Sequence, residues 1–401
     1  MSEDRAPRVL LVSQRGHKKP LFRSSGYEFE DVIRLVDDTE LFAPECTVSS
    51  RLPYERHIFE FIGRYTDFDI KRRARLSPPK LVRYYDMLFV PLSAPHELIH
   101  LEHMLDILCG HCRLAVCYIE ELWPHGLKSD RLLRPLEKFD HILLGSSGTC
   151  EALSRALRKP VTYLPHGIDM GRFCPYPNPP RRTIDVYAMG RCSAQTHRAL
   201  LEWAEQTGST YLFDSISGVA HPWSMEKHRH LIASLIKRCR YFLVNPAKID
   251  APEETSGQQE VGPRFYEGAG AGAVLLGQSP QCSANFAENF DWPDAIIEMP
   301  FGTADVAELL SQLDAQPERI QRIQYHNVVN CLRRHDWVYR WLDALKRIGL
   351  EPSPMALQRQ RHLQELAATI PTYCLADHRR VWEQGRNRGP SRPSLCFDKA
   401  K

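Results

Sequence analysis

The chain has 401 residues, enough for two ordinary domains, and its 43% hydrophobic and 25% charged residues exclude a low-complexity or disordered protein. The formal net charge of +3 gives no general reason to expect a nucleic-acid partner. The sequence starts without a secretory-leader pattern, and no apolar run approaches the roughly 18 residues that cross a bilayer.

Short apolar runs alternate with longer amphipathic segments in the first half of the chain. Such runs, bounded by polar or turn residues, are typical of strands in a parallel sheet that is covered on both faces. Helices are expected between them, at 97–108 and 149–157. The alternation predicts an α/β domain of βαβ units. Its strands are expected at 8–13, 87–92, 114–119 and 141–145.

The first expected helix begins with a possible metal site. His96-Glu97-Leu98-Ile99-His100 fits H-E-x-x-H, in which two His on one helix face hold zinc and the Glu activates a water. Glu120 follows at a separation that some zinc proteases use for a third ligand, but it ends a strand pattern. The pattern can arise by chance in a chain with 17 His, so we predict no metal site and keep a zinc hydrolase as an alternative.

Cysteine usage points to a reducing compartment. The 12 Cys show no framework spacing, so reduced thiols and a cytoplasmic location are expected. Cys109 and Cys112 form a C-x-x-C pair without thioredoxin-like surroundings, and no redox role is predicted for them.

A second series of strands and helices follows a Pro-rich stretch at 174–180. We therefore predict a first domain at 1–166, a second at 167–350, and a helix with a mobile tail at 351–401. Basic clusters at 71–75 and 379–392 are interpreted as solvated surface. The strands are expected at 184–189, 210–213, 241–244 and 273–276 with an edge strand at 295–298, and the helices at 306–313, 317–333, 338–348 and 355–368.

The chemistry is expected where the strand ending at Val244-Asn245 leads through a polar loop to a helix that starts at Gly262-Pro263. Proline suits the first helical turn, and glycine lets a ligand approach the backbone. A helix N-terminus offers free N–H groups and a positive dipole end to a phosphate. Arg264 and Glu267 lie one turn apart, on or near the same face, and the small residues 268–273 let the helix lie close to the sheet.

This helix resembles the nucleotide-sugar site of GT-B glycosyltransferases, specifically the family-4-like and spore-maturation-protein-like (CgeB-type) groups. Residues 265–274, Phe-Tyr-Glu-Gly-Ala-Gly-Ala-Gly-Ala-Val, resemble the E-A-x-A-x-G segment. The resemblance implies that Glu267 binds the donor ribose and that Arg264 and the helix N-terminus face the diphosphate. Gly190-Arg191 resembles the strand-end G-R whose Arg meets the phosphates, and 161–175 and 335–337 resemble the passage between domains and the closing helices.

One departure concerns the residue that contacts the donor sugar. Family-4 enzymes carry two Glu with seven residues between them, and counting back from Glu267 gives Gln259. Glu260, one residue away, is expected to take this role.

The resemblance implies a GT-B fold, two Rossmann-like domains facing a central cleft with a C-terminal helical tail. It implies a hexosyltransferase-type enzyme of carbohydrate biosynthesis that uses a UDP- or GDP-sugar, requires no cofactor and retains the anomeric configuration. The acceptor would be a small molecule, glycan, lipid or protein, bound by segments 14–17 and 24–28. The alternative is a GT-B-shaped nucleotide-binding or scaffold protein without turnover. The expected catalytic residues are Glu260, Arg191 and Arg264, and the expected donor-binding residues are Glu267, Gly262, Arg264, Arg191, Gly190 and Asn245.

Overall fold

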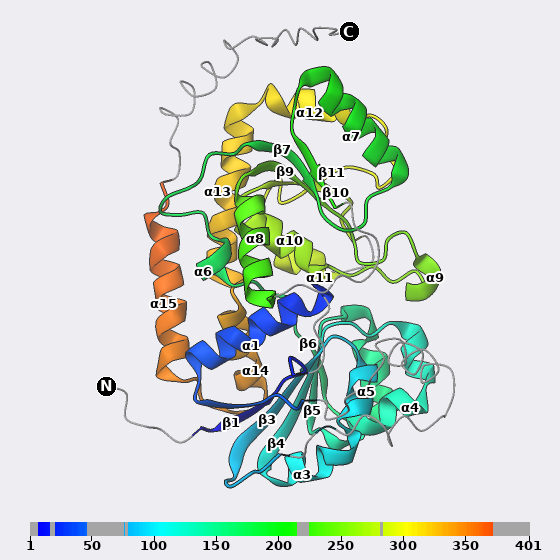
Figure 1. Ribbon diagram of the computed structural model, residues 1–401, viewed down its shortest axis with the longest axis vertical. Coiled ribbons are helices and arrows are strands. Elements are labelled where there is room, and N and C mark those ends of the chain that lie inside the picture. Colours follow the sequence, from blue (N-terminus) through cyan, green and yellow to red (C-terminus); the bar gives the residue numbers. More distant parts are fainter. Residues whose placement is uncertain are drawn as a thin grey trace, which may run out of the picture.

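The computed structural model contains two separate parallel β-sheets (Figure 1). His17 and both basic clusters lie outside the residues that it describes. The described residues are 7–16, 21–45, 76, 79–214, 224–280 and 284–371.

The first sheet has the strand order β2-β1-β3-β4-β5-β6, and each neighbouring pair is parallel. All four predicted strands are present, because each consists of apolar residues that the helices on both faces bury. The connections leave in opposite directions from β1 and β3, so the carboxyl ends of these two strands mark the switch point where α/β sheets bind ligands. The strands are β1 (Val9–Val12), β2 (Thr39–Phe42), β3 (Tyr85–Leu92), β4 (Cys112–Ile119), β5 (His141–Leu144) and β6 (Val161–Tyr163).

The helix predicted at 97–108 is wrong in type. The structure has two short 3₁₀ segments followed by one α-helical turn and a half. Leu98, Leu101 and Met104 are fully buried, and their spacing of three residues matches the three-residue turn of a 3₁₀ helix. The helical segments of this half are η1 (Leu21–Arg23), α1 (Ser24–Val36), η3 (Pro95–His100), η4 (Glu102–Met104), α3 (Leu105–Gly110), η5 (Pro124–Lys128), α4 (Asp130–Leu133), η6 (Arg134–Lys138), η7 (Ser147–Thr149) and α5 (Cys150–Leu157).

The second sheet has the order β11-β10-β9-β7-β8 and is also parallel throughout. The predicted edge strand is confirmed as β11. The switch point of this sheet lies between β7 and β9. Its elements are α6 (Met170–Phe173), β7 (Ile184–Ala188), α7 (Ala194–Thr207), β8 (Tyr211–Phe213), α8 (Met225–Lys237), β9 (Cys239–Val244), α9 (Pro252–Thr255), α10 (Pro263–Gly270), β10 (Val274–Gly277), α11 (Ala284–Asn289), β11 (Ile297–Glu298), α12 (Val306–Asp314) and α13 (Pro317–Arg334).

The last two helices, α14 (Trp337–Arg347) and α15 (Pro354–Thr369), return to the first half of the chain and pack against α1 (Figure 1). Phe29 of α1 stacks on Trp337, with ring centroids 4.5 Å apart. Trp341 donates a hydrogen bond to Asp37, at 2.8 Å. Both tryptophans are fully buried, so these helices hold the two halves of the chain together through a shared core.

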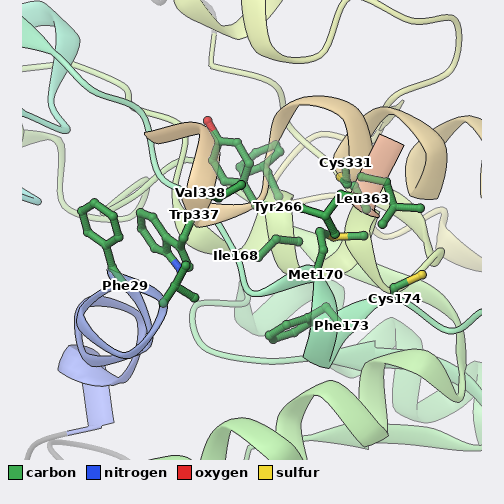
Figure 2. Close-up of a cluster of buried hydrophobic side chains, with 14 of the residues drawn as sticks. Phe29, Ile168, Met170, Phe173, Cys174, Tyr266, Cys331, Trp337, Val338 and Leu363 are labelled. Carbon is green, nitrogen blue, oxygen red and sulfur yellow. The ribbon is translucent and has the colours of Figure 1, made fainter. Parts of the chain in front are cut away.

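The crossing segment after β6 runs through this shared core (Figure 2). Ile168 exchanges backbone hydrogen bonds with His335 and Trp337, at 3.0 and 2.9 Å. A Cβ added to Gly167 would lie 2.7 Å from the ring of Trp337, so glycine is needed for this close approach. Figure 2 shows side chains from α1, the crossing segment, α10, α13, α14 and α15 meeting here.

The predicted architecture of two Rossmann-like α/β domains followed by a C-terminal helix is confirmed. The domain boundaries at 166 and 350 stay a prediction. None of the helices in the described residues combines the length and the apolar character that a membrane crossing needs.

Candidate functional site

Three of the predicted donor-binding residues lie at the switch point of the second sheet. Gly190 follows β7 with φ of +88°, and its N–H donates to Asp214 at 3.0 Å. Arg191 forms an ion pair with Asp250, and both side chains are about half exposed. Asn245 follows β9, and its Oδ1 accepts a 3.4 Å hydrogen bond from the residue after β10. These residues share one sheet edge, and each has a local partner.

Helix α10 begins beside this edge, as predicted. Gly262 is its N-cap and Pro263 its first residue. Among the described residues, and apart from its chain neighbours, no atom lies within 4 Å of a Cβ built on Gly262, so the helix start is not crowded on that side. Arg264 and Glu267 form an ion pair, which confirms that they share one face. Arg264 remains 31% exposed, so part of its guanidinium faces solvent.

Glu267 is 1% exposed, and both of its oxygens are engaged in a buried ion network. Arg264 pairs with one oxygen, and Arg229 of α8 pairs with the other. Arg229 also holds Glu28 of α1, with Nε–Oε2 and Nη2–Oε1 distances of 2.9 and 3.1 Å. Glu28 in turn accepts from the backbone N–H of Asp169 at 2.8 Å. The network therefore links α1 of the first domain to α8 and α10 of the second.

The charges in this network set the protonation of Glu267. Burial alone would raise the pKa of this carboxyl, but Arg264 and Arg229 outweigh it and lower the pKa to about 2. For Arg229, burial lowers the pKa while the carboxylates of Glu28 and Glu267 raise it, and the balance is a raised pKa. Both groups are thus charged across the physiological range.

The depressed pKa predicts acid sensitivity. Because Glu267 titrates at about 2 in the folded chain and near 4.5 when unfolded, its stabilising effect is complete above pH 4.5 and is lost as the pH falls towards 2. We expect protonation of this carboxyl to lower the free energy of unfolding by about 3 kcal/mol. Denaturant unfolding of the parent and of Glu267→Gln at several pH values measures it. The stability difference between them should shrink between pH 5 and 2, and a constant difference would contradict the pairing.

Glu260 bonds to two residues of the first domain and to Gln258 of its own loop. Its carboxylate accepts from the Ser147 hydroxyl and the Gly148 N–H, both at 2.9 Å, and from Gln258 at 2.6 Å. Ser147 and Gly148 begin η7, and the first N–H groups of a helical segment have no partner within it, so a carboxylate is stabilised there. The structure therefore uses Glu260 to join the loop before α10 to the first domain.

Sequence reasoning missed Arg229, although a signal for it exists. Arg229, Ile232, Ala233 and Ile236 recur at the spacing of one helix face, and all four are buried. An arginine on an otherwise apolar stripe indicates a buried ion pair, because a buried charge needs a partner. Its partner Glu28 was predicted to line the acceptor side and instead lies within the network.

The H-E-x-x-H pattern does not form the geometry of a zinc site. Pro95–His100 is a 3₁₀ helix, so His96 and His100 are not placed on one face as in an α-helix. Glu97 is 1% exposed, lies 2.5 Å from Arg23, and accepts from the Ser93 N–H at 2.8 Å. Within the ranges that the structure describes, no group of three His, Cys, Asp or Glu could hold a metal ion. The pattern is better explained as part of the packing of the first sheet.

The C-x-x-C pair also lacks the features of a redox site. Burial raises the pKa of Cys109 to about 11 and that of Cys112 to about 12. A reactive thiol needs a lowered pKa, because the thiolate is the nucleophile. Both cysteines are therefore inert thiols at neutral pH.

A comparison with protein families finds a similarity in the part of the chain that contains this site. A family model described as "Glycosyl transferase-like" matches residues 179–346. The matched region contains the switch point of the second sheet and all of α10. The curated proteins include no match to the chain.

Solved structures that resemble the chain include several glycosyltransferases. A glycosyltransferase from Rickettsia africae is 10% identical, with 85% of this chain and 97% of that chain covered and a TM-score of 0.46. AviGT4, a glycosyltransferase involved in avilamycin A biosynthesis, is 12% identical, with coverage of 85% and 98% and a TM-score of 0.40. UGT89C1 of Arabidopsis thaliana, complexed with UDP, is 13% identical, with coverage of 90% and 99% and a TM-score of 0.38.

Proposed function

We propose that this chain is a hexosyltransferase that moves a sugar from a UDP- or GDP-sugar to an acceptor hydroxyl with retention of the anomeric configuration. The observation that carries the proposal is the arrangement at the switch point of the second sheet. There Gly262 begins α10 with no described atom outside its chain neighbours within 4 Å of its Cβ position, and the partly exposed Arg264 stands one turn before a charged Glu267. An anion-binding helix N-terminus next to an ionised carboxylate suits a diphosphate joined to a ribose.

In this proposal each residue has a separate task. Arg191, Arg264 and the N–H groups at the start of α10 offset the charge that develops on the leaving diphosphate. Gly190 and Asn245 shape the floor of the site at the strand ends, and Glu267 accepts hydrogen bonds from the ribose hydroxyls. Since both oxygens of Glu267 are engaged in the described conformation, the ribose must share them with Arg264 or displace it.

Glu260 has its own place in the proposal. It would reach the donor sugar after leaving Ser147 and Gly148, so donor binding and the contact between the domains are coupled. No residue in this scheme needs a metal ion to stabilise the diphosphate.

One observation favours the alternative of a nucleotide-binding protein without turnover. The carboxylates of Glu267 and Glu260 are both satisfied by protein groups, as they would be in a permanently closed scaffold. Release of nucleoside diphosphate from a panel of UDP- and GDP-sugars, with and without sugar acceptors, separates the two functions. Acceptor-dependent release supports the transferase. The NMR coupling constant of the anomeric proton in the product then reports the configuration. Tight nucleotide binding without any release would support the scaffold.

A further inference from the structure

A small hollow lies at the carboxyl ends of β3 and β4 in the first sheet. It encloses about 10 Å³, close to the space that one water molecule requires. Its walls come from the start of α1 and the carboxyl ends of β3 and β4. The lining residues are Arg23, Gly26, Glu30, Pro91, Leu92, Ser93, Tyr118 and Glu120.

Three of these lining residues carry buried polar atoms without a hydrogen-bond partner among the described residues. The atoms are Arg23 Nε, the Tyr118 hydroxyl and Glu120 Oε1. The residues are 3%, 0% and 7% exposed. A buried polar atom without a partner costs on the order of 1–3 kcal/mol. Such a group in a folded protein requires an explanation, and three around one hollow indicate that something else completes them.

The chemistry of the three atoms selects the missing group. Arg23 Nε–H can only donate, Glu120 Oε1 can accept, and the Tyr118 hydroxyl can do both. The walls also hold charges of both signs, since Glu30 pairs with Arg15 and Glu97 with Arg23. A simple cation or anion would meet like charges, whereas a hydroxyl group both donates and accepts and carries no charge.

Glu120 is placed to receive that hydroxyl. A Cβ on Gly26 would lie 2.9 Å from Glu120 Oε1, so glycine leaves space in front of this oxygen. Burial raises the pKa of Glu120 to about 8, opposed by Arg23 and Ser93 and increased by Glu121 and Glu97. At neutral pH Glu120 is mostly protonated, so it can also donate.

The carboxyl end of β4, next to the hollow, lies close to charged residues of the second domain. Glu121 follows Glu120. Burial raises the pKa of Glu121, and the positive charges of Lys248 and Arg191 in the second domain oppose this rise. The Lys248 ammonium lies 5.7 Å from the ring centroid of Trp123. A group bound at the carboxyl ends of β3 and β4 would therefore lie on the interface with the proposed donor site.

We propose that this hollow binds a hydroxyl group of a carbohydrate or polyol acceptor through Arg23, Tyr118 and Glu120. The assignment rests on the proposed function and names its acceptor class. The rest of the acceptor extends towards the second domain.

Tyr118→Phe is the sharpest variant, because it removes only the unpartnered hydroxyl. Ligand-observed NMR would measure the binding of glycerol and D-glucose to the full chain, with 1,2-dimethoxyethane as an analogue that cannot donate. We expect the two polyols to bind, the ether to bind less, and Tyr118→Phe to weaken the polyols about threefold to tenfold. Tyr85→Phe is the control, since it removes a hydroxyl of β3 that donates to Glu40 at 2.7 Å. It should leave polyol binding unchanged.

Stability and nucleotide binding complete the test. Tyr118→Phe should be at least as resistant to urea as the parent, because its hydroxyl has no partner to lose; a clear destabilisation would show a structural role and overturn the proposal. Equal polyol binding by the parent and Tyr118→Phe, or no polyol binding, would also overturn it. UDP and GDP affinity is measured in parallel. If neither nucleotide binds but polyol binding depends on Tyr118, the proposed function fails and the hydroxyl site stands.

Discussion

Arg229→Met is expected to destabilise the fold by about 3–5 kcal/mol, because it leaves the buried carboxylates of Glu28 and Glu267 without their shared cation. Arg229 is 2% exposed and each carboxylate is 1% exposed, so water cannot replace the lost contacts. The measurement is urea unfolding at neutral pH. Arg238→Met, an exposed arginine at the end of the same helix, is the matched control and should cost less than about 1 kcal/mol.

A triple variant tests whether charge causes the loss of stability in Arg229→Met. If uncompensated carboxylates produce the loss, adding Glu28→Gln and Glu267→Gln to Arg229→Met should recover much of the stability. A triple variant no more stable than the single variant would show that Arg229 acts through packing. If Arg229→Met is as stable as the parent, the ion network does not stabilise the fold.

Gly277→Ala is expected to cost at least about 2–3 kcal/mol. Gly277 ends β10 with φ of +153°, and a Cβ there would lie 1.6 Å from the Val244 carbonyl oxygen. The clash involves the backbone of the neighbouring strand, so no side-chain rotation relieves it. Because Asn245 follows Val244, β9 and β10 must separate at the proposed nucleotide site.

Urea unfolding and nucleotide binding together test this second prediction. Both stability and UDP or GDP affinity should fall in Gly277→Ala. Gly110→Ala is the control, since no atom that the structure describes beyond the adjoining chain lies within 4 Å of a Cβ built there and alanine favours a helix. Parent-like stability of Gly277→Ala would mean that the strand ends tolerate a side chain and that their spacing is not fixed.

The strands of both sheets could be predicted because their signal is local. The run at 87–92 and the run at 241–244 are continuous apolar stretches of strand length, and the structure places them in β3 and β9. The start of α10 at Gly262-Pro263 was equally clear, since both residues have a defined use at a helix N-terminus. The resemblance of 265–274 depends on the same local information.

The contacts between the domains could not be predicted in the same way. Glu28, Arg229 and Glu267 are separated by 201 and 38 residues along the chain, and only the docking of three helices brings them together. The engagement of Glu267 and Glu260 by other protein groups was therefore not predicted. The 3₁₀ helix at Pro95–His100 was missed because one buried stripe fits both helix types over a short segment.

The central claim is that the second domain binds a nucleoside diphosphate at Arg264 and the start of α10, and isothermal titration tests it most directly. UDP and GDP, with uridine and guanosine as phosphate-free controls, would be titrated into the parent and Arg264→Ala. Arg264→Ala should fold, because Glu267 keeps Arg229 as a partner. The account predicts that one diphosphate binds the parent and binds Arg264→Ala about tenfold to a hundredfold more weakly, with nucleoside binding unchanged. Equal diphosphate affinity in both proteins, or no binding of either diphosphate by the parent, would contradict it.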